Sequence, residues 1–378
     1  MIDPKTALDT LQSQGVTFFA GVPDSLLKNL CACIDGELSP EHHMITANEG
    51  GAVAVAVGHY LATGNVPCVY MQNSGLGNTV NPLLSLVDPE VYSIPMLLVI
   101  GWRGEPGVSD EPQHVKQGPV TPALLEAMGI SYDIVPETSE GFQETVANAI
   151  AVAKKEQSPR ALLIRKGTFD SYENTSTPEN KNVDLMSRET LLEITLETLA
   201  GDTVYVGTTG KLSRELFELR EKRSEGHEKD FLTVGSMGHA SQIALGIAQE
   251  VPNKTIVCLD GDGAALMHLG GLVTIGSRKP RNYIHIIVNN GVHESVGGQC
   301  VTGSDVDYTA LAKSVGYVDA YTIETQLELK EVLRKVENQE KPVLLNCHVC
   351  PGSRKDLGRP TISPQTNKDT FMEQFNQI

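Results

Sequence analysis

Short apolar runs that do not alternate with polar residues dominate the pattern of this chain. Helix-compatible segments lie near them, such as the Ala/Val/Gly-rich stretch from Glu49 to Gly64. Unbroken apolar runs joined by helices are typical of parallel strands that are covered on both faces. The pattern therefore predicts an α/β fold with two doubly wound parallel sheets, whose strands include 16–22, 67–73, 95–102 and 160–167, then 202–210, 254–263, 283–291 and 341–349.

The composition and periodicity of the sequence change after about residue 170. The segment FDSYENTSTPENKNVD is polar, contains a proline and shows no periodicity, which is typical of a linker. In doubly wound domains the ligand binds beyond the carboxyl ends of the strands, so the loops after the apolar runs should carry the chemistry. We expect a first domain over 1–170, a linker over 171–186, a second domain over 187–350 and a C-terminal tail over 351–378, which is a candidate lid.

The composition restricts the classes of function. The formal net charge is −17 and the pI about 5.0, which disfavours nucleic acid as a partner because such binding depends on Lys and Arg. We expect no signal peptide and no membrane partner, since the N-terminus lacks the signal pattern and no apolar run reaches ~20 residues. Seven cysteines without a disulfide framework favour buried thiols and a cytoplasmic location.

Polar residues follow two of the apolar runs in the second half. Asp260-Gly261-Asp262-Gly263 ends one run, and Asn289-Asn290-Gly291 ends the next, with 25 residues between Gly263 and Asn289. Gly261 and Gly263 would leave N–H groups free for phosphate oxygens, at the start of a helix near Ala264. Carboxylate, amide and carbonyl oxygens suit Mg²⁺, so the candidate ligands are Asp262, Asn290 and a backbone carbonyl at Gly291 or Val292. Either half alone is equally consistent with an ordinary tight turn.

The spacing G-D-G, about 25 residues, N-N resembles the thiamin diphosphate motif of the decarboxylase and acetolactate synthase superfamily. The resemblance implies that Mg²⁺ is bound by Asp262, Asn290 and the carbonyl of Val292, and that the metal anchors the diphosphate of thiamin diphosphate. It also implies two domains of the thiamin diphosphate-binding fold. No third, central domain is expected, since full-size relatives are much longer.

The resemblance assigns further residues to the cofactor. Glu49 opens an E-x-x-A segment like the one that supplies the catalytic glutamate, which contacts the aminopyrimidine ring in that superfamily. Alone, a glutamate at a helix N-terminus is more often a dipole partner. The turn Gly235-Ser236-Met237-Gly238 is similar to the one whose apolar residue wedges between the cofactor's rings, although a methionine is commonly core filler. The remaining candidates for contacts with the diphosphate or the substrate are Thr208, Thr209 and Gly210. The alternative is that they only cap a helix.

With two domains and no third, the chain resembles small decarboxylases that act on 2-keto acids with a phosphonate or a sulfonate group. Asp24 in GVPD and His114 in DEPQH are the candidate proton-relay residues, with an N-cap and a loop histidine as the alternatives. Related decarboxylases carry a glutamate where this chain has Val296, so His293 or Glu294 is the candidate replacement. A small anionic 2-keto acid needs cations, and the candidates are Arg103, Lys211, Arg354, Lys355 and Arg359.

The resemblance implies self-association as well. In the superfamily the cofactor lies between the first half of one subunit and the second half of another, so Glu49 and Asp262 would come from different chains. Carboligation and a non-catalytic cofactor-binding module are the rival functions, and the presence of Glu49 counts against the second. A Rossmann dehydrogenase is disfavoured, because no G-x-G-x-x-G opens the first βαβ unit.

Overall fold

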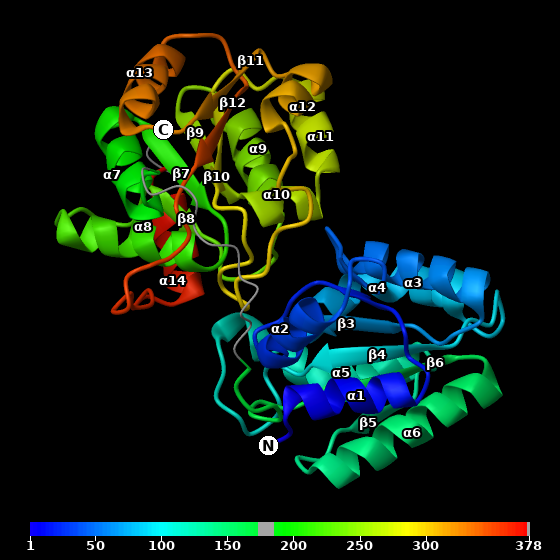
Figure 1. Cartoon of the computed structure of the whole chain (residues 1–378). Coiled ribbons are helices and arrows are strands. Elements are labelled where there is room, and N and C mark those ends of the chain that lie inside the picture. The colour runs from blue at the N-terminus through cyan, green and yellow to red at the C-terminus, as the bar shows by residue number, and fades with distance from the viewer. Residues whose placement is uncertain (173–184, 376–378) are drawn as a thin grey trace. The chain divides into compact units, whose positions relative to one another are not determined.

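The computed structural model describes residues 1–172 and 185–375, so most of the expected linker lies outside the described residues. The chain divides into two compact units, Met1–Thr177 with His293–Thr302, and Pro178–Val292 with Gly303–Ile378. Each unit contains a six-stranded sheet in which every pairing is parallel. The predicted fold class is therefore confirmed (Figure 1).

In the first unit, α1 (Pro4–Ser13), α2 (Lys28–Glu37) and α6 (Ser139–Glu156) enclose one core with the sheet. The other core contains side chains of α3 (Glu49–Thr63), α4 (Leu76–Pro82) and α5 (Gln117–Ala127). Three short helical segments are η1 (Asn73–Gly75), η2 (Leu83–Val87) and η3 (Pro112–His114). The strands are β1 (Phe19–Gly21), β2 (His43–Ile45), β3 (Cys68–Gln72), β4 (Met96–Gly101), β5 (Tyr132–Ile134) and β6 (Pro159–Ile164).

In the second unit, α7 (Arg188–Thr198), α8 (Lys211–Lys222) and α13 (Gln326–Glu337) contribute to the main core. The remaining helices are α9 (Ala240–Glu250), α10 (Asp262–Met267), α11 (Gly270–Arg278), α12 (Tyr308–Val315) and α14 (Pro364–Glu373). The strands are β7 (Thr203–Gly207), β8 (Asp230–Leu232), β9 (Thr255–Gly261), β10 (Tyr283–Asn289), β11 (Asp319–Ile323) and β12 (Val343–His348).

The two sheets share one topology. The first has the order β2-β1-β3-β4-β6-β5, and the second, read from β8, has the order β8-β7-β9-β10-β12-β11. In both, the chain crosses back over its first strand, so a switch point lies between β1 and β3 and another between β7 and β9. Ligands of doubly wound sheets bind at such switch points, beyond the carboxyl ends of the strands. Each unit therefore offers one edge of its sheet for a ligand.

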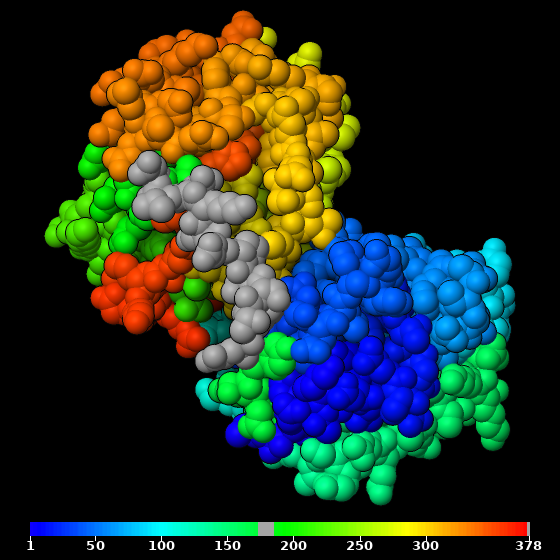
Figure 2. All heavy atoms as spheres, viewed as in Figure 1, coloured from blue at the N-terminus to red at the C-terminus, as the bar shows by residue number. Residues whose placement is uncertain are grey.

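The C-terminal tail packs on its own unit. Asn367 in α14 donates to the carbonyl of Asp230 and accepts from the N–H of Leu232, at 2.8 and 3.0 Å, and Phe371 lies against Phe231. Figure 2 shows this segment, in red, on the surface of the second unit. The described part of the tail thus has a docked position beside β8, and its role as a lid stays a prediction.

Candidate active site

Four loops of the second unit follow the carboxyl ends of neighbouring strands and carry the residues predicted to hold the cofactor. The register pairs Val288 of β10 with Gly261 of β9, so the loops that contain Asp262 and Asn290 begin side by side. Thr208 to Gly210 follow β7, and the turn from Gly235 to Gly238 comes shortly after β8. The sheet therefore brings the predicted second-domain residues to one edge.

Asp262 is the first residue of α10 and is 6% exposed. Its Oδ2 accepts a hydrogen bond from the N–H of Gly291 at 2.8 Å, and its own carbonyl accepts from the hydroxyl of Tyr308 at 3.0 Å. Burial raises the pKa of Asp262 to about 6, although backbone N–H groups lower it in part. A buried carboxylate of this kind is stabilised by a bound cation, as expected of a metal ligand.

Asn290 lies in the loop whose backbone contacts Asp262. Its Oδ1 accepts from the N–H of Val292 at 3.1 Å. This hydrogen bond joins the side chain of Asn290 to the backbone of Val292, the two metal candidates on either side of Gly291. The loop presents amide and carbonyl oxygens next to a carboxylate, which is a donor set that suits Mg²⁺.

The turn from Gly235 to Gly238 approaches the start of α10. Ser236 has φ 54°, a left-handed conformation that residues other than glycine seldom adopt. Gly238 has φ 84°, and a Cβ there would lie 2.9 Å from the carbonyl of Ala264. The close approach explains why glycine occupies position 238, and it brings the Met237 turn to the same edge as Asp262.

The loop after β7 is fixed to its neighbours. The Thr209 hydroxyl donates to the carbonyl of Val234 at 2.8 Å, and the N–H of Thr208 donates to the carbonyl of Leu259 at 2.8 Å. Gly210 is the N-cap of α8, and Lys211 is its first residue. The predicted helix start is thus present, and the contacts of these residues with a diphosphate stay a prediction.

Glu49 of the first unit is held in one place. It is the first residue of α3, capped by Asn48, and is 5% exposed. Its Oε2 accepts from the side-chain amide of Asn78 at 2.7 Å. A Cβ added at Gly75 would overlap the Glu49 carboxyl, so only glycine leaves room for it. A buried, oriented carboxyl is the arrangement that a catalytic glutamate requires.

Asp24 lies in the loop after β1 and His114 is the last residue of η3, and both are buried. Oδ2 of Asp24 accepts from the N–H groups of Leu26 and Leu27, at 2.9 and 3.2 Å, whereas Oδ1 is buried and has no partner among the described residues. Burial raises the pKa of Asp24 to about 6, and Arg103 opposes that shift. Burial, with Arg103 in second place, lowers the pKa of His114.

One basic candidate of the tail, Arg354, is paired with acidic residues of the second unit. Arg354 forms ion pairs with Glu189 at 3.1 Å and with Glu218, and the Glu218 contact raises its pKa. Lys355 and Arg359 are exposed in the segment before α14. His293 and Glu294 lie in the loop after β10. They belong to its segment His293–Thr302, which is part of the first compact unit. These substrate assignments stay predictions.

The residues fit the implied cofactor and metal by the chemistry of their donors. Asp262 and Asn290 supply hard oxygen ligands, and the glycine at 238 keeps the turn close to α10. Asp24 has a buried oxygen that finds no partner within residues 1–172 and 185–375. Sequence reasoning missed Asn78, Gly75 and Tyr308, which position the Glu49 carboxyl and the start of α10. For Asn78 and Gly75 the signal was the polar and glycine content of residues 72–78, and Tyr308 had no such signal.

Comparison with known proteins defines the class. Residues 5–124 match the family described as thiamine pyrophosphate enzyme, N-terminal TPP binding domain, and residues 206–347 match the C-terminal TPP binding domain of such enzymes. The chain is therefore a thiamine pyrophosphate enzyme, with one matching domain around each sheet. The predicted cofactor, thiamin diphosphate, is confirmed.

Full-length relatives narrow the class. The chain is 35% identical to phosphonopyruvate decarboxylase of Streptomyces viridochromogenes, over 96% of this chain and 92% of the relative. It is 34% identical to that of Streptomyces hygroscopicus, over 99% and 94%. Sulfopyruvate decarboxylase of Methanosarcina acetivorans is 27% identical, over 97% and 96%. The chain belongs to the phosphonopyruvate decarboxylase family, and it is accordingly a carbon–carbon lyase of the carboxy-lyase class.

Proposed function

We propose that this chain decarboxylates 3-phosphonopyruvate to phosphonoacetaldehyde and CO₂, with thiamin diphosphate and Mg²⁺. The observation that carries the proposal is the similarity to two phosphonopyruvate decarboxylases over nearly the full length of both partners. The aldehyde product suits a following amination, so the proposal extends to phosphonate biosynthesis of the 2-aminoethylphosphonate type. Sulfopyruvate is the alternative substrate, because that decarboxylase is also a full-length relative.

Asp262, Asn290 and the carbonyl of Val292 would hold Mg²⁺, and the loops after β7 and β8 would hold the cofactor. When bound, thiamin diphosphate supplies the electron sink that decarboxylation of a 2-keto acid requires. The support for this assignment is the pair of adjacent loops, in which Asp262 accepts from Gly291 and Asn290 accepts from Val292. The chain's oxygen donors therefore suit a hard cation beside a diphosphate.

Glu49 would exchange a proton with the aminopyrimidine of the cofactor. Its burial and its hydrogen bond from Asn78 support this role, because they orient the carboxyl and exclude water. Asp24 and His114 would deliver and accept protons at the reacting carbon. With its pKa raised to about 6, Asp24 is protonated more readily near neutral pH than an ordinary aspartate, which suits a proton donor.

The raised pKa of Asp24 predicts a pH-dependent stability. Between pH 3.8, the ordinary pKa of an aspartate, and about pH 6, the folded protein keeps a proton on Asp24 that the unfolded chain has lost. Protonated Asp24 therefore stabilises the folded state below this window, and the stabilisation is lost as the pH rises through it. We expect Asp24→Asn, which cannot ionise, to match wild type near pH 4 and to exceed its free energy of unfolding by about 1–3 kcal/mol near pH 8. Urea unfolding at both pH values measures this. An equal difference at the two pH values would exclude the assigned pKa shift.

We propose self-association through α3. No Asp, Glu, Lys or Arg occurs between Glu49 and Asp88, although a fifth of the chain is charged. Ala54, Gly58 and Leu61 are exposed at helical spacing on α3, and Leu61 is 71% exposed. An uncharged face of this kind is typical of an interface. Some sulfopyruvate decarboxylase relatives consist of alpha and beta subunits, which supports assembly in this family.

A charge on this face should weaken the assembly. We expect Leu61→Glu to lower the molar mass measured by light scattering at micromolar concentration, since burying an unpaired carboxylate is costly. The matched control is Leu327→Glu in α13, because Leu327 is 66% exposed. If both variants keep the mass of wild type, α3 does not form the interface.

We propose a cytoplasmic location. All seven cysteines are free thiols, which suits a reducing compartment. In the part of the chain that the structure describes, no helix has the length and apolarity needed to cross a membrane.

The test of the proposed function is a comparison of substrates. Wild type is assayed with phosphonopyruvate, sulfopyruvate and pyruvate, each with and without thiamin diphosphate and Mg²⁺. The proposal predicts CO₂ release that depends on both additions and a kcat/KM that is highest for phosphonopyruvate. A higher kcat/KM for sulfopyruvate would assign the alternative function, and a hydroxy-ketone as main product would indicate carboligation.

A further inference from the structure

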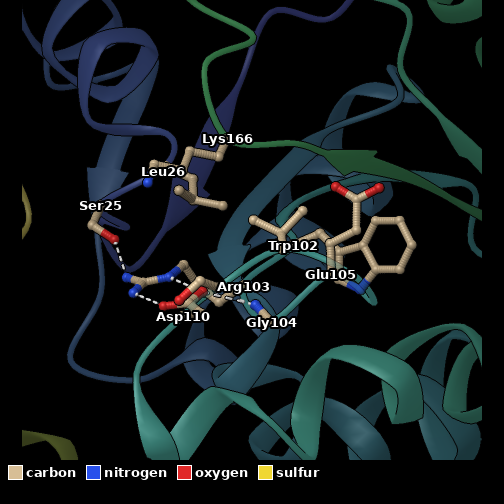
Figure 3. Close-up of a pocket in the computed structure, with 10 residues that line it drawn as sticks. Ser25, Leu26, Trp102, Arg103, Gly104, Glu105, Asp110 and Lys166 are labelled. Atoms are coloured by element: carbon tan, nitrogen blue, oxygen red, sulfur yellow. Dashed lines mark hydrogen bonds and ion pairs between the residues drawn. The ribbon is translucent and has the colours of Figure 1, made fainter.

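A cavity of about 230 Å³ opens at the ligand-binding edge of the first sheet. Its walls come from the loops after three strands, with Ser25 after β1, Trp102 to Asp110 after β4, and Lys166 after β6. Figure 3 shows Arg103 between Ser25 and Asp110, with Lys166 and Trp102 on other parts of the wall. The volume suits a ligand of a few carbon atoms, below the usual size of a site for drug-sized molecules.

Arg103 is fixed in this wall from several directions. Its Nε donates to Asp110 at 2.8 Å, a second N–H also donates to Asp110, and a third donates to the Ser25 hydroxyl at 2.7 Å. Asn73 binds the backbone of Arg103, donating to its carbonyl at 2.8 Å. A guanidinium has five N–H groups, so two beyond these three can serve a ligand. The side chain is thus preorganised, and it loses little freedom when an anion binds.

The charged residues that line the cavity are two cations, Arg103 and Lys166, and two anions, Glu105 and Asp110. Asp110 is paired with Arg103, which holds the pKa of Asp110 well below its usual range. Glu105 is paired with Arg165 at 2.8 Å. Lys166 is exposed and forms no ion pair within residues 1–172 and 185–375. Both acidic groups are thus neutralised by arginines, whereas Lys166 is left to attract an anion locally, in a chain whose net charge is −17.

We propose that this cavity binds the tetrahedral oxyanion end of the substrate, the phosphonate of phosphonopyruvate, through Lys166, the free N–H groups of Arg103 and the Ser25 hydroxyl. This inference rests on the proposed function for the identity of the ligand. Lys166 supplies the charge, and Arg103 and Ser25 supply directed donors. Asp24 immediately precedes Ser25, so a substrate anchored here by its phosphonate would have its keto acid end near the candidate proton donor.

The cavity contains its own reporter. Trp102 is the single tryptophan of the chain and lines the cavity, with its indole N–H donating to the carbonyl of Gly118 at 2.8 Å. Its fluorescence should change when an anion enters. The probe is 3-phosphonopropionate, which has the carboxylate and phosphonate of the substrate but no keto group to react. Butyrate, which lacks the phosphonate, is the control ligand.

The experiment titrates both probes into the protein with thiamin diphosphate and Mg²⁺ and follows the fluorescence of Trp102. We expect saturable binding of 3-phosphonopropionate that is at least about tenfold tighter than that of butyrate. Lys166→Met, which keeps the apolar stem, should weaken it by about tenfold to a hundredfold. The matched control is Lys155→Met, an exposed lysine of α6, which should bind like wild type.

The outcomes separate this site from the proposed function. Equal affinity of wild type and Lys166→Met, equal affinity for the two probes, or no fluorescence response would each overturn the phosphonate site. Turnover of phosphonopyruvate with an unchanged KM in Lys166→Met would contradict the site while the function stands. Binding that depends on Lys166, in a protein that does not release CO₂ from phosphonopyruvate, would contradict the function while the anion site stands.

Discussion

Replacing Glu49 with glutamine should lower kcat for decarboxylation by about 10²–10⁴-fold, the usual contribution of a general acid or base. Glutamine has nearly the shape of glutamate and keeps an oxygen that can accept from Asn78, so the pocket should stay intact. What it lacks is the ability to exchange a proton. The affinity for thiamin diphosphate should therefore change little, and steady-state kinetics with calorimetric titration of the cofactor measures both quantities.

The control for this substitution is Glu90→Gln, at an exposed position of the same unit. It should leave both kcat and cofactor affinity unchanged. A Glu49→Gln variant with the kcat of wild type would remove Glu49 from the catalytic machinery. A variant that loses the cofactor altogether would instead make Glu49 a binding residue.

Replacing Asp262 with asparagine should weaken Mg²⁺-dependent binding of thiamin diphosphate by about 100-fold or more. Loss of a residue that only orients a metal ligand already costs 10–100-fold in metal affinity, and a direct ligand should cost at least as much. Asparagine keeps an oxygen for the N–H of Gly291 but removes the charge. Titration calorimetry with thiamin diphosphate at several Mg²⁺ concentrations measures the change.

Asp305→Asn, at an exposed position of the second unit, is the matched control and should bind the cofactor like wild type. If Asp262→Asn also keeps the affinity of wild type and its dependence on Mg²⁺, the metal is held elsewhere. The buried position of Asp262 makes the test sensitive, because a charge there is not screened by solvent.

The strands that sequence analysis predicted and those that it missed differ in position. The eight predicted runs correspond to the inner strands of the two sheets, which are covered on both faces. The missed strands β2, β5, β8 and β11 are the four edge strands. An edge strand is short and partly exposed, as in His43–Ile45 and Tyr132–Ile134. It therefore needs no continuous apolar run, and a pattern search has little to detect.

The site shows a similar division. Asp262, Asn290 and Glu49 stand in local motifs with a fixed spacing, so a single sequence was enough to single them out, and their roles stay predictions. Asn78 is 29 residues from the Glu49 carboxyl that it orients, and Lys166 is 63 residues from Arg103. Such partners are brought together only by the order of the strands in the sheet. An isolated lysine or asparagine has no spacing signal that would distinguish it from surface residues.

We propose that Glu49 of one copy and Asp262 of another serve a single cofactor. The most direct test coexpresses Glu49→Gln and Asp262→Asn chains with different tags and assays the purified mixture. Random pairing in a dimer places one intact site in half of the molecules, so the account predicts about a quarter of wild-type activity from two variants that are nearly inactive alone. A mixture no more active than its separate components would contradict it.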